Sequence, residues 1–154
     1  MDVEIRGLTV DDVELICFHR AQMFLDAGVG EETVGPMIEH FGPWLEPRLR
    51  DGSYFGYVAT FDGLPVASVG LMVIEWPPHP LHPSDHRRGY ILNMFVVPSH
   101  RRQGLGRRLM ELADQRFQEL GVSLVVLHAT EKGQKLYRTL GWSETSEMVK
   151  RLAP

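Results

Sequence analysis

The chain has little of several features that mark common protein classes. It holds one cysteine in 154 residues, so no disulfide can form within it, and no stretch approaches the roughly 18 apolar residues that a membrane span requires. Positive charge is not in excess, because 16 lysines and arginines stand against 20 acidic residues, a net charge of −4. We therefore expect neither a nucleic-acid partner nor a membrane partner.

The length fits a single domain covering residues 1–154. A domain of this size can bury enough surface to fold without disulfide bonds or a structural metal. The first residues, Met1–Arg6, carry charges in place of the apolar core of a secretory signal, and we expect a cytoplasmic protein. Cys17 stands among apolar residues of an expected helix, with no base or oxyanion motif beside it. We interpret it as a buried core thiol.

The hydrophobic pattern predicts an α/β domain with a mixed sheet. Alternating or continuous apolar residues predict strands at 3–8, 54–61, 65–75, 90–97, 123–128 and 147–152. Helical spacing predicts helices at 10–26, 31–50, 104–120 and 131–140, the second interrupted around Gly42-Pro43. Asp62-Gly63 between two of the strands is a hairpin signal. A strand, helix and strand across 90–128 imply parallel pairing of those two strands, beside an antiparallel meander.

A glycine-rich turn, Arg101–Gly106, follows the strand expected at 90–97 and opens a helix. Such a turn points unpaired backbone N–H groups and the positive helix end at one small volume, which suits a phosphate. Arg107 and Arg108 add further positive charge beside the turn. Neither the P-loop nor the dinucleotide pattern fits, because no Gly-Lys-Ser/Thr follows and the three-glycine spacing is missing.

Two segments resemble the GNAT superfamily of acyl-CoA-dependent N-acetyltransferases. The residues Val96–Gly106 are similar to its signature Gln/Arg-x-x-Gly-x-Gly/Ala, which follows a strand carrying Val-x-Pro. The residues Leu127–Trp142 resemble its second signature, in which a strand end precedes Leu-Tyr-x-x-Leu-Gly-Phe/Trp. The resemblance implies a GNAT fold and acetyl-CoA as the donor cosubstrate, with no metal. It also implies transfer to an amine acceptor and a possible homodimer.

The resemblance also implies which residues bind the donor. The pyrophosphate of acetyl-CoA would sit on the amides of the turn, and the strand before it would bind the pantetheine arm and polarise the thioester carbonyl. Thr130 stands where many members carry an asparagine that binds the arm. The cofactor-binding residues expected on this basis are Met94, Phe95, Val96, Arg101, Arg102, Gln103, Gly104, Leu105, Gly106, Arg107, Thr130 and Gly133.

Tyr137 matches the family's general acid, which protonates the departing thiolate. A phenol with an ordinary pKa of about 10 is protonated at neutral pH and can donate to an alkyl thiolate. The alternative is a tyrosine packed beside the cofactor without donating. The general base is open, since Val125 stands where some members carry a glutamate and Asn93 cannot accept a proton. Glu75, His128 and a water chain are the candidates.

A proline-rich loop at 76–89 contains His79, His82 and His86. Its prolines prevent a helix from placing the imidazoles on one face, so a metal site is disfavoured and a substrate lid is the preferred interpretation.

The function predicted from these motifs is N-acetyl transfer to a primary amine of a small molecule or peptide. Two alternatives stay open at this point, a non-catalytic acyl-CoA-binding regulatory module and a nucleotide- or sugar-phosphate-binding protein. No motif in the sequence identifies the acceptor, which could be a small amine, an amino acid, an antibiotic or a protein N-terminus.

Overall fold

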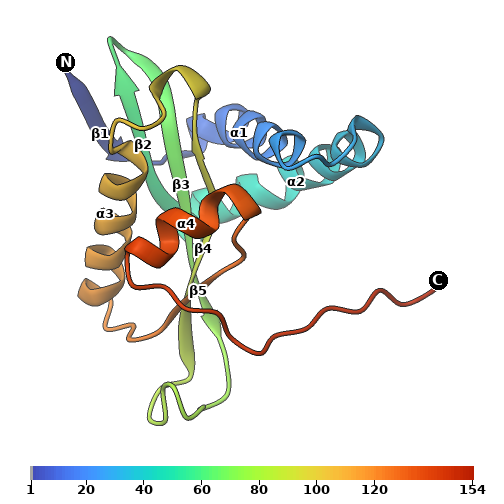
Figure 1. Cartoon of the computed structure of the whole chain (residues 1–154), viewed down its shortest axis with the longest axis vertical. Helices are drawn as coiled ribbons and strands as arrows, with labels where there is room; N and C mark the ends of the chain where they lie inside the picture. The colour runs from blue at the N-terminus through green and yellow to red at the C-terminus, as the bar shows by residue number, and fades with distance from the viewer. Residues whose placement is uncertain (1) are drawn as a thin grey trace.

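One five-stranded mixed sheet organises the chain in the computed structural model, which describes residues 2–154 (Figure 1). The strand order follows the sequence, and β5 is parallel to β4 whereas all other neighbours are antiparallel. The strands are β1 (Val3–Gly7), β2 (Phe55–Phe61), β3 (Leu64–Glu75), β4 (Arg87–Val96) and β5 (Val125–Leu127). The predicted meander and the parallel pair are thereby confirmed.

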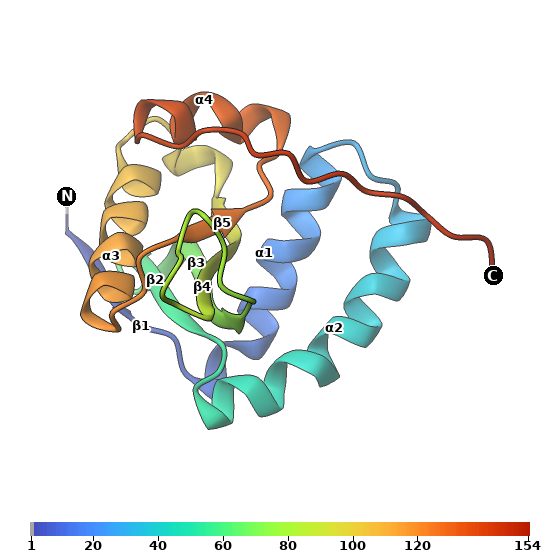
Figure 2. The same cartoon turned by 90° about the horizontal axis from the view of Figure 1, so that it is seen from below.

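The helices lie on both faces of this sheet (Figure 2). They are α1 (Val13–Asp26), α2 (Glu31–Asp51), α3 (Leu105–Glu119) and α4 (Glu131–Thr139), with short 3-10 turns at Val10–Asp12 and Pro98–His100. The helices α1 and α2 cover one face, and α3 covers the other. None of the helices in residues 2–154 is both long and apolar enough to cross a membrane.

Each face has its own apolar core. On the α3 side, Leu109, Ala113 and Phe117 lie one helical turn apart and pack on inward-facing strand residues such as Val69 and Ile91. On the other side, a cluster joins α1 and α2 to the sheet through Ile16, Phe41, Leu45, Leu49 and Tyr54. Cys17 packs on this second cluster and is half-buried, and burial raises the pKa of its thiol.

The hairpin between β2 and β3 is confirmed. Asp62 and Gly63 both have positive φ, 50° and 79°, and they connect the paired residues Phe61 and Leu64. Two consecutive left-handed residues define the tight turn that matches the twist of antiparallel strands.

The predicted break around Gly42-Pro43 is wrong, because α2 runs without interruption from Glu31 to Asp51. Three prolines, Pro36, Pro43 and Pro47, lie inside this helix, and all three are exposed. Each removes one N–H donor, but the carbonyls left without a partner are on the solvent side, where water can satisfy them. Figure 2 shows α2 curving around the domain, as expected for a helix with prolines on its outer face.

The strand predicted at 147–152 does not form. Residues 143–154 have no regular structure and are exposed, despite the apolar side chains of Met148, Val149 and Leu152. A strand is stabilised by hydrogen bonds to a neighbour, and this segment has none within residues 2–154. The sequence pattern was suitable for a strand, but no partner strand is supplied by the same fold.

His19 generates a prediction about stability and pH. It is 1% exposed on α1, its Nδ1 lies 2.7 Å from Ser68 Oγ, and burial lowers its pKa to about 4. The unfolded chain binds this proton near pH 6.5 and the folded protein only near pH 4. Stability should therefore fall as pH drops through that window, by about 3 kcal/mol from this group.

Urea unfolding of the wild type and of His19→Gln at pH 7.5 and pH 4.5 measures this contribution. The stability difference between the two proteins should change by about 2–3 kcal/mol in favour of the variant at the lower pH. A constant difference across this range would show that His19 does not titrate in this way.

Candidate functional site

The turn between β4 and α3 presents a row of unpartnered backbone donors. Arg102 and Gly104 have positive φ, 61° and 81°, the left-handed conformation that occurs in backbone anion-binding turns. Within residues 2–154, no backbone N–H of residues 102–107 donates to a protein acceptor; the first helical bond is Arg108 N–H to Gly104 O, 3.0 Å. Together with the positive end of α3, these donors form a site for an anion.

The side chains around the turn differ in their roles. Arg101 is committed to neighbouring elements, because its Nε donates to Val96 O at 2.8 Å and its Nη2 to Asp26 Oδ2 at 2.7 Å. It therefore ties the end of α1 to the end of β4. Arg102, Gln103 and Arg107 are exposed beside the turn, and Leu105 is buried in the core below it.

The edge of β4 is open next to this turn. β5 ends at Leu127, opposite Ile91, whereas β4 continues to Val96. Residues 92–96 consequently have no partner strand on the β5 side within the described chain. The backbone groups of Met94, Phe95 and Val96 lie on this segment, as a ligand that pairs with a strand edge would require.

β4 contains a bulge, which changes which of its side chains face the α1–α2 core and which face the α3 core. The register between β3 and β4 shifts between Ser68 and Gly70, and Asn93 has a φ of 56°. Asn93 is 3% exposed and faces the α1 side, where Oδ1 accepts from Arg20 Nη1 at 2.7 Å and Nδ2 donates to Tyr54 Oη at 2.8 Å. The Asn93 side chain therefore holds the bulge in place.

Sequence reasoning missed this cluster. Arg20 lies over the rings of Phe24 and Phe41, at 5.0 Å and 4.6 Å from their centroids, and its buried Nε has no partner within residues 2–154. Arg20 is 73 residues from Asn93 in the chain, so no local pattern connects them. The one available signal was the tolerance of asparagine for left-handed backbone.

Replacement of Asn93 tests the bulge. Asn93→Gly removes both hydrogen bonds but keeps the left-handed conformation accessible, and should destabilise the protein by about 1–3 kcal/mol. Asn93→Ala adds the strain of a left-handed alanine and should cost roughly 1 kcal/mol more. Urea unfolding of both variants measures the difference. An Asn93→Ala variant as stable as Asn93→Gly would contradict the conformational role.

The N-terminal half of α4 reaches the same region. Thr130 caps the helix, with Oγ1 accepting from Gly133 N–H at 3.3 Å. A Cβ on Gly133 would lie 2.9 Å from the Tyr137 ring, and one on Gly106 would lie 3.2 Å from Leu136 and 3.5 Å from Met94. Gly106 and Gly133 therefore have packing roles that bring the turn, β4 and α4 together.

Tyr137 is half-buried in this contact region. Burial raises the pKa of its phenol, and its ring centroid lies 6.1 Å from that of Trp142. Burial is the only cause of this shift, and no hydrogen bond of the hydroxyl to the described residues contributes to it. A protonated phenol without a protein acceptor is available to a ligand.

The two candidate bases lie in different places. His128 follows β5 and is exposed, with Nε2 3.6 Å from Glu147 Oε2 and its ring centroid 5.7 Å from that of Tyr90. Glu75 is at the far end of β3, opposite Arg87. Seven residues separate it from Ser68, the partner of Phe95, a distance of about 23 Å along the strand. The structure does not bring Glu75 to the open segment of β4.

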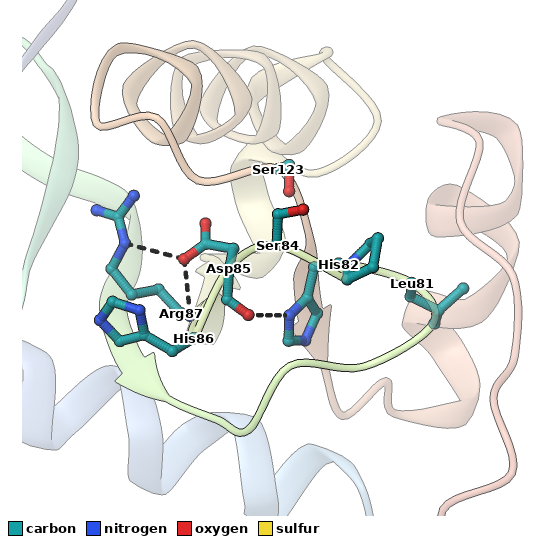
Figure 3. A pocket seen from close by; sticks show the side chains of 8 residues that line it. Leu81, His82, Ser84, Asp85, His86, Arg87 and Ser123 are labelled. Atoms are coloured by element: carbon teal, nitrogen blue, oxygen red, sulfur yellow. Dashed lines mark hydrogen bonds and ion pairs between the residues drawn. The ribbon is translucent and has the colours of Figure 1, made fainter.

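The loop expected to act as a lid lies at that same far end of the sheet (Figure 1). His82 is 2% exposed, and its Nδ1 donates to Asp85 O while its Nε2 accepts from Arg88 Nε, both at 2.8 Å. Figure 3 shows His82 and Asp85 among the residues that line an open cavity, with Arg87 bonded to Asp85. Residues 2–154 contain no group of three His, Cys, Asp or Glu side chains placed to hold a metal ion. The loop is an ordered connection at the end of the sheet opposite the turn, and its expected role as a substrate lid stays a prediction.

Comparison with known proteins shows which family and which solved structures this chain is similar to. The model of the acetyltransferase (GNAT) family matches residues 20–142. The chain is similar to a GCN5-related N-acetyltransferase from Ralstonia eutropha JMP134, with 54% identity, a TM-score of 0.98 and coverage of 99% of this chain and 100% of that chain. A predicted acetyltransferase from Clostridium acetobutylicum, solved with acetyl-CoA, shares the fold at 19% identity, with a TM-score of 0.89 and coverage of 98% and 96%. A ribosomal-protein-alanine N-acetyltransferase from Brucella melitensis does so at 23% identity, with a TM-score of 0.67 and coverage of 99% and 100%.

Proposed function

The chain belongs to the GNAT family of acetyltransferases and is itself an acetyltransferase, and we propose that it moves an acetyl group from acetyl-CoA to a primary amine. The acceptor would be a small molecule or a peptide, attacked directly in a ternary complex. The observation that carries the proposal is the row of unpartnered N–H groups at 102–107, next to the open edge of β4 and the free Tyr137 hydroxyl.

Donor binding follows from these groups. The amides of the turn would hold the pyrophosphate, which needs several donors converging on one volume. The pantetheine arm would run along Met94–Val96, pairing with backbone groups that β5 does not reach. Thr130 Oγ1 already accepts from Gly133, so its hydroxyl proton is free to donate to the arm.

The chemistry requires one bond to form and one to break. The neutral amine nitrogen attacks the thioester carbon, and the backbone of Met94–Val96 would stabilise the developing oxyanion. As the carbon–sulfur bond breaks, Tyr137 would protonate the thiolate. The raised pKa of Tyr137 keeps its phenol protonated at neutral pH, as a general acid requires. His128 or a water chain would take the proton from the amine.

Thiol release tests the activity directly. Acetyl-CoA mixed with the protein and a panel of amines, including amino acids, aminoglycosides and peptide N-termini, should release free CoA with at least one acceptor. Acetyl-CoA should also raise the melting temperature, and ATP or NAD should not. Binding of acetyl-CoA without turnover of any amine would favour a regulatory binding module and would contradict the proposal.

Tyr137→Phe should lower kcat on the order of 100-fold with little change in the KM for acetyl-CoA, because the ring is kept and only the proton donor is lost. Steady-state kinetics measure both constants. Tyr57→Phe on β2 loses the same hydroxyl away from the turn and serves as the matched control. A variant with the wild-type kcat would reduce Tyr137 to a packing role.

Gly104, in the turn before α3, and Gly63, in the β2–β3 hairpin, allow a matched test of donor binding at the turn. Their φ values are 81° and 79°, and a Cβ on either would meet nothing within 4 Å. Gly104→Ala and Gly63→Ala should therefore each cost roughly 1–2 kcal/mol of stability from backbone strain. Only Gly104→Ala should weaken acetyl-CoA binding, because we propose that the pyrophosphate binds at the turn of residues 102–107 and not at the β2–β3 hairpin. Calorimetric titration measures the affinity, and equal affinities in the two variants would place the donor elsewhere.

A further inference from the structure

Arg20 on α1 carries a positive charge that no acidic residue neutralises. Its side chain is half-buried, and none of the ion pairs within residues 2–154 includes it. Burial lowers the pKa of Arg20, and the groups that act in the opposite direction are Tyr54, Cys17 and Tyr90. Phenols and thiols are neutral at pH 7, and burial raises the pKa of all three groups further. The guanidinium therefore stays charged and has no counterion in the described chain.

A charge that is partly removed from water is costly without a partner. The Nε of Arg20 is buried and has no hydrogen-bond partner, alone among the buried side-chain nitrogen and oxygen atoms of residues 2–154. The neutral contacts of the guanidinium offset part of this cost. They are the hydrogen bond from Nη1 to Asn93 Oδ1 and the faces of Phe24 and Phe41. The arrangement favours an anion supplied from outside the chain.

Arg20 lies beside the strand segment on which we propose that the thioester binds. Asn93, which accepts from its Nη1 at 2.7 Å, directly precedes Met94 on the part of β4 that β5 does not cover. The helix α1 is on the face of the sheet opposite α3, whose start would hold the pyrophosphate (Figure 2). An attacking amine must come within about 3–3.5 Å of the thioester carbon. An acceptor in that position borders the guanidinium.

Tyr90 connects Arg20 with the remaining candidate base. It is half-buried on β4, and its phenol is close enough to both Arg20 and Glu147 for their charges to affect its pKa, which burial raises most. Its ring centroid lies 5.7 Å from that of His128. A row of polar side chains therefore runs from a fixed positive charge at Arg20 to an imidazole at His128. An acceptor between them would meet an anion site at one end and a proton acceptor at the other.

We propose that the acceptor carries a carboxylate, which pairs with Arg20 while the amine of the same molecule attacks the thioester. This inference rests on the proposed acetyl transfer and names its acceptor class, an α-amino acid or another small amine with a carboxylate a few bonds from the nitrogen. With Nη1 bonded to Asn93, the other N–H groups of the guanidinium are left for the carboxylate, the group whose geometry they match. A peptide N-terminus has an amide in place of this carboxylate and would leave the charge unpaired.

Acceptors that differ only at the carboxyl group test the inference. Release of free CoA from acetyl-CoA is measured with phenylalanine, its amide and phenethylamine, and with alanine, its amide and ethylamine. The comparison is made at equal concentrations of neutral amine, because the three members of a set differ in the pKa of the amine. The carboxylate member should have a kcat/KM on the order of 10–100-fold above the other two. No preference for the carboxylate in either set would overturn the proposal.

Arg20→Met should bring the preference within each set close to 1, whereas Arg20→Lys should keep part of it. Any general damage from the substitution acts on all members of a set and cancels in their ratio. Arg48→Met is the matched control, because Arg48 is also half-buried and lies 4.2 Å from the centroid of the Trp44 ring. Tyr54→Phe removes the other hydrogen bond of Asn93 and keeps the charge. Both controls should retain the wild-type preference, and its persistence in Arg20→Met would contradict the assignment.

Calorimetric titration separates this inference from the activity itself. On the protein saturated with CoA, which has no acetyl group to transfer, an amino acid should bind on the order of 10–100-fold more tightly than its amide. Arg20→Met should lose this difference. Carboxylate-dependent binding without release of CoA from acetyl-CoA would support the anion site and contradict acetyl transfer. Turnover of amines without carboxylate-dependent binding would support acetyl transfer and overturn the role of Arg20, as would the absence of amino-acid binding altogether.

Discussion

The parting of two parallel strands is the feature on which the rest of the structure depends. β5 pairs with β4 only as far as Ile91 and Leu127, and β4 then continues alone to Val96. Unpaired backbone groups of a central strand would normally be costly, and here they border the amides of the turn at 102–107. An extended donor with a phosphate group at one end satisfies both sets at once, which is why the fold and the proposed function are physically linked.

Small residues and one bulge make this arrangement possible. Gly106 lets the start of α3 approach Met94 and Leu136, and Gly133 leaves room for the Tyr137 ring. On the opposite face, Asn93 accepts from Arg20 and donates to Tyr54, so the two apolar cores hold the bulged strand from both sides. The side on which we propose that the acceptor binds is bordered by His128 and by the C-terminal segment, both exposed.

The regular elements were predictable because local chemistry specifies them. Asp62-Gly63 selected the hairpin turn, and the spacing from Leu105 to Phe117 gave α3 its buried face. The predicted break in α2 was wrong because the Gly42-Pro43 pair does not reveal which face of the helix its proline occupies, and Pro36, Pro43 and Pro47 are all exposed. Glu75 lies in β3, the strand beside β4, but at the end of that strand away from the turn, because the antiparallel register pairs it with Arg87 at the start of β4.

The sequence by itself determined the family and the turn, because the glycines and the Val-Pro and Leu-Tyr motifs lie in short contiguous segments whose backbone needs are local. Only the tertiary structure decided that Arg101 binds Asp26, that Arg20 reaches Asn93, and that His82 organises a loop far from the turn. The same is true of residues 147–152, whose strand-like pattern has no neighbour in the chain. Hydrogen bonds between distant segments depend on how the chain is packed, and residue order alone does not encode which partners meet.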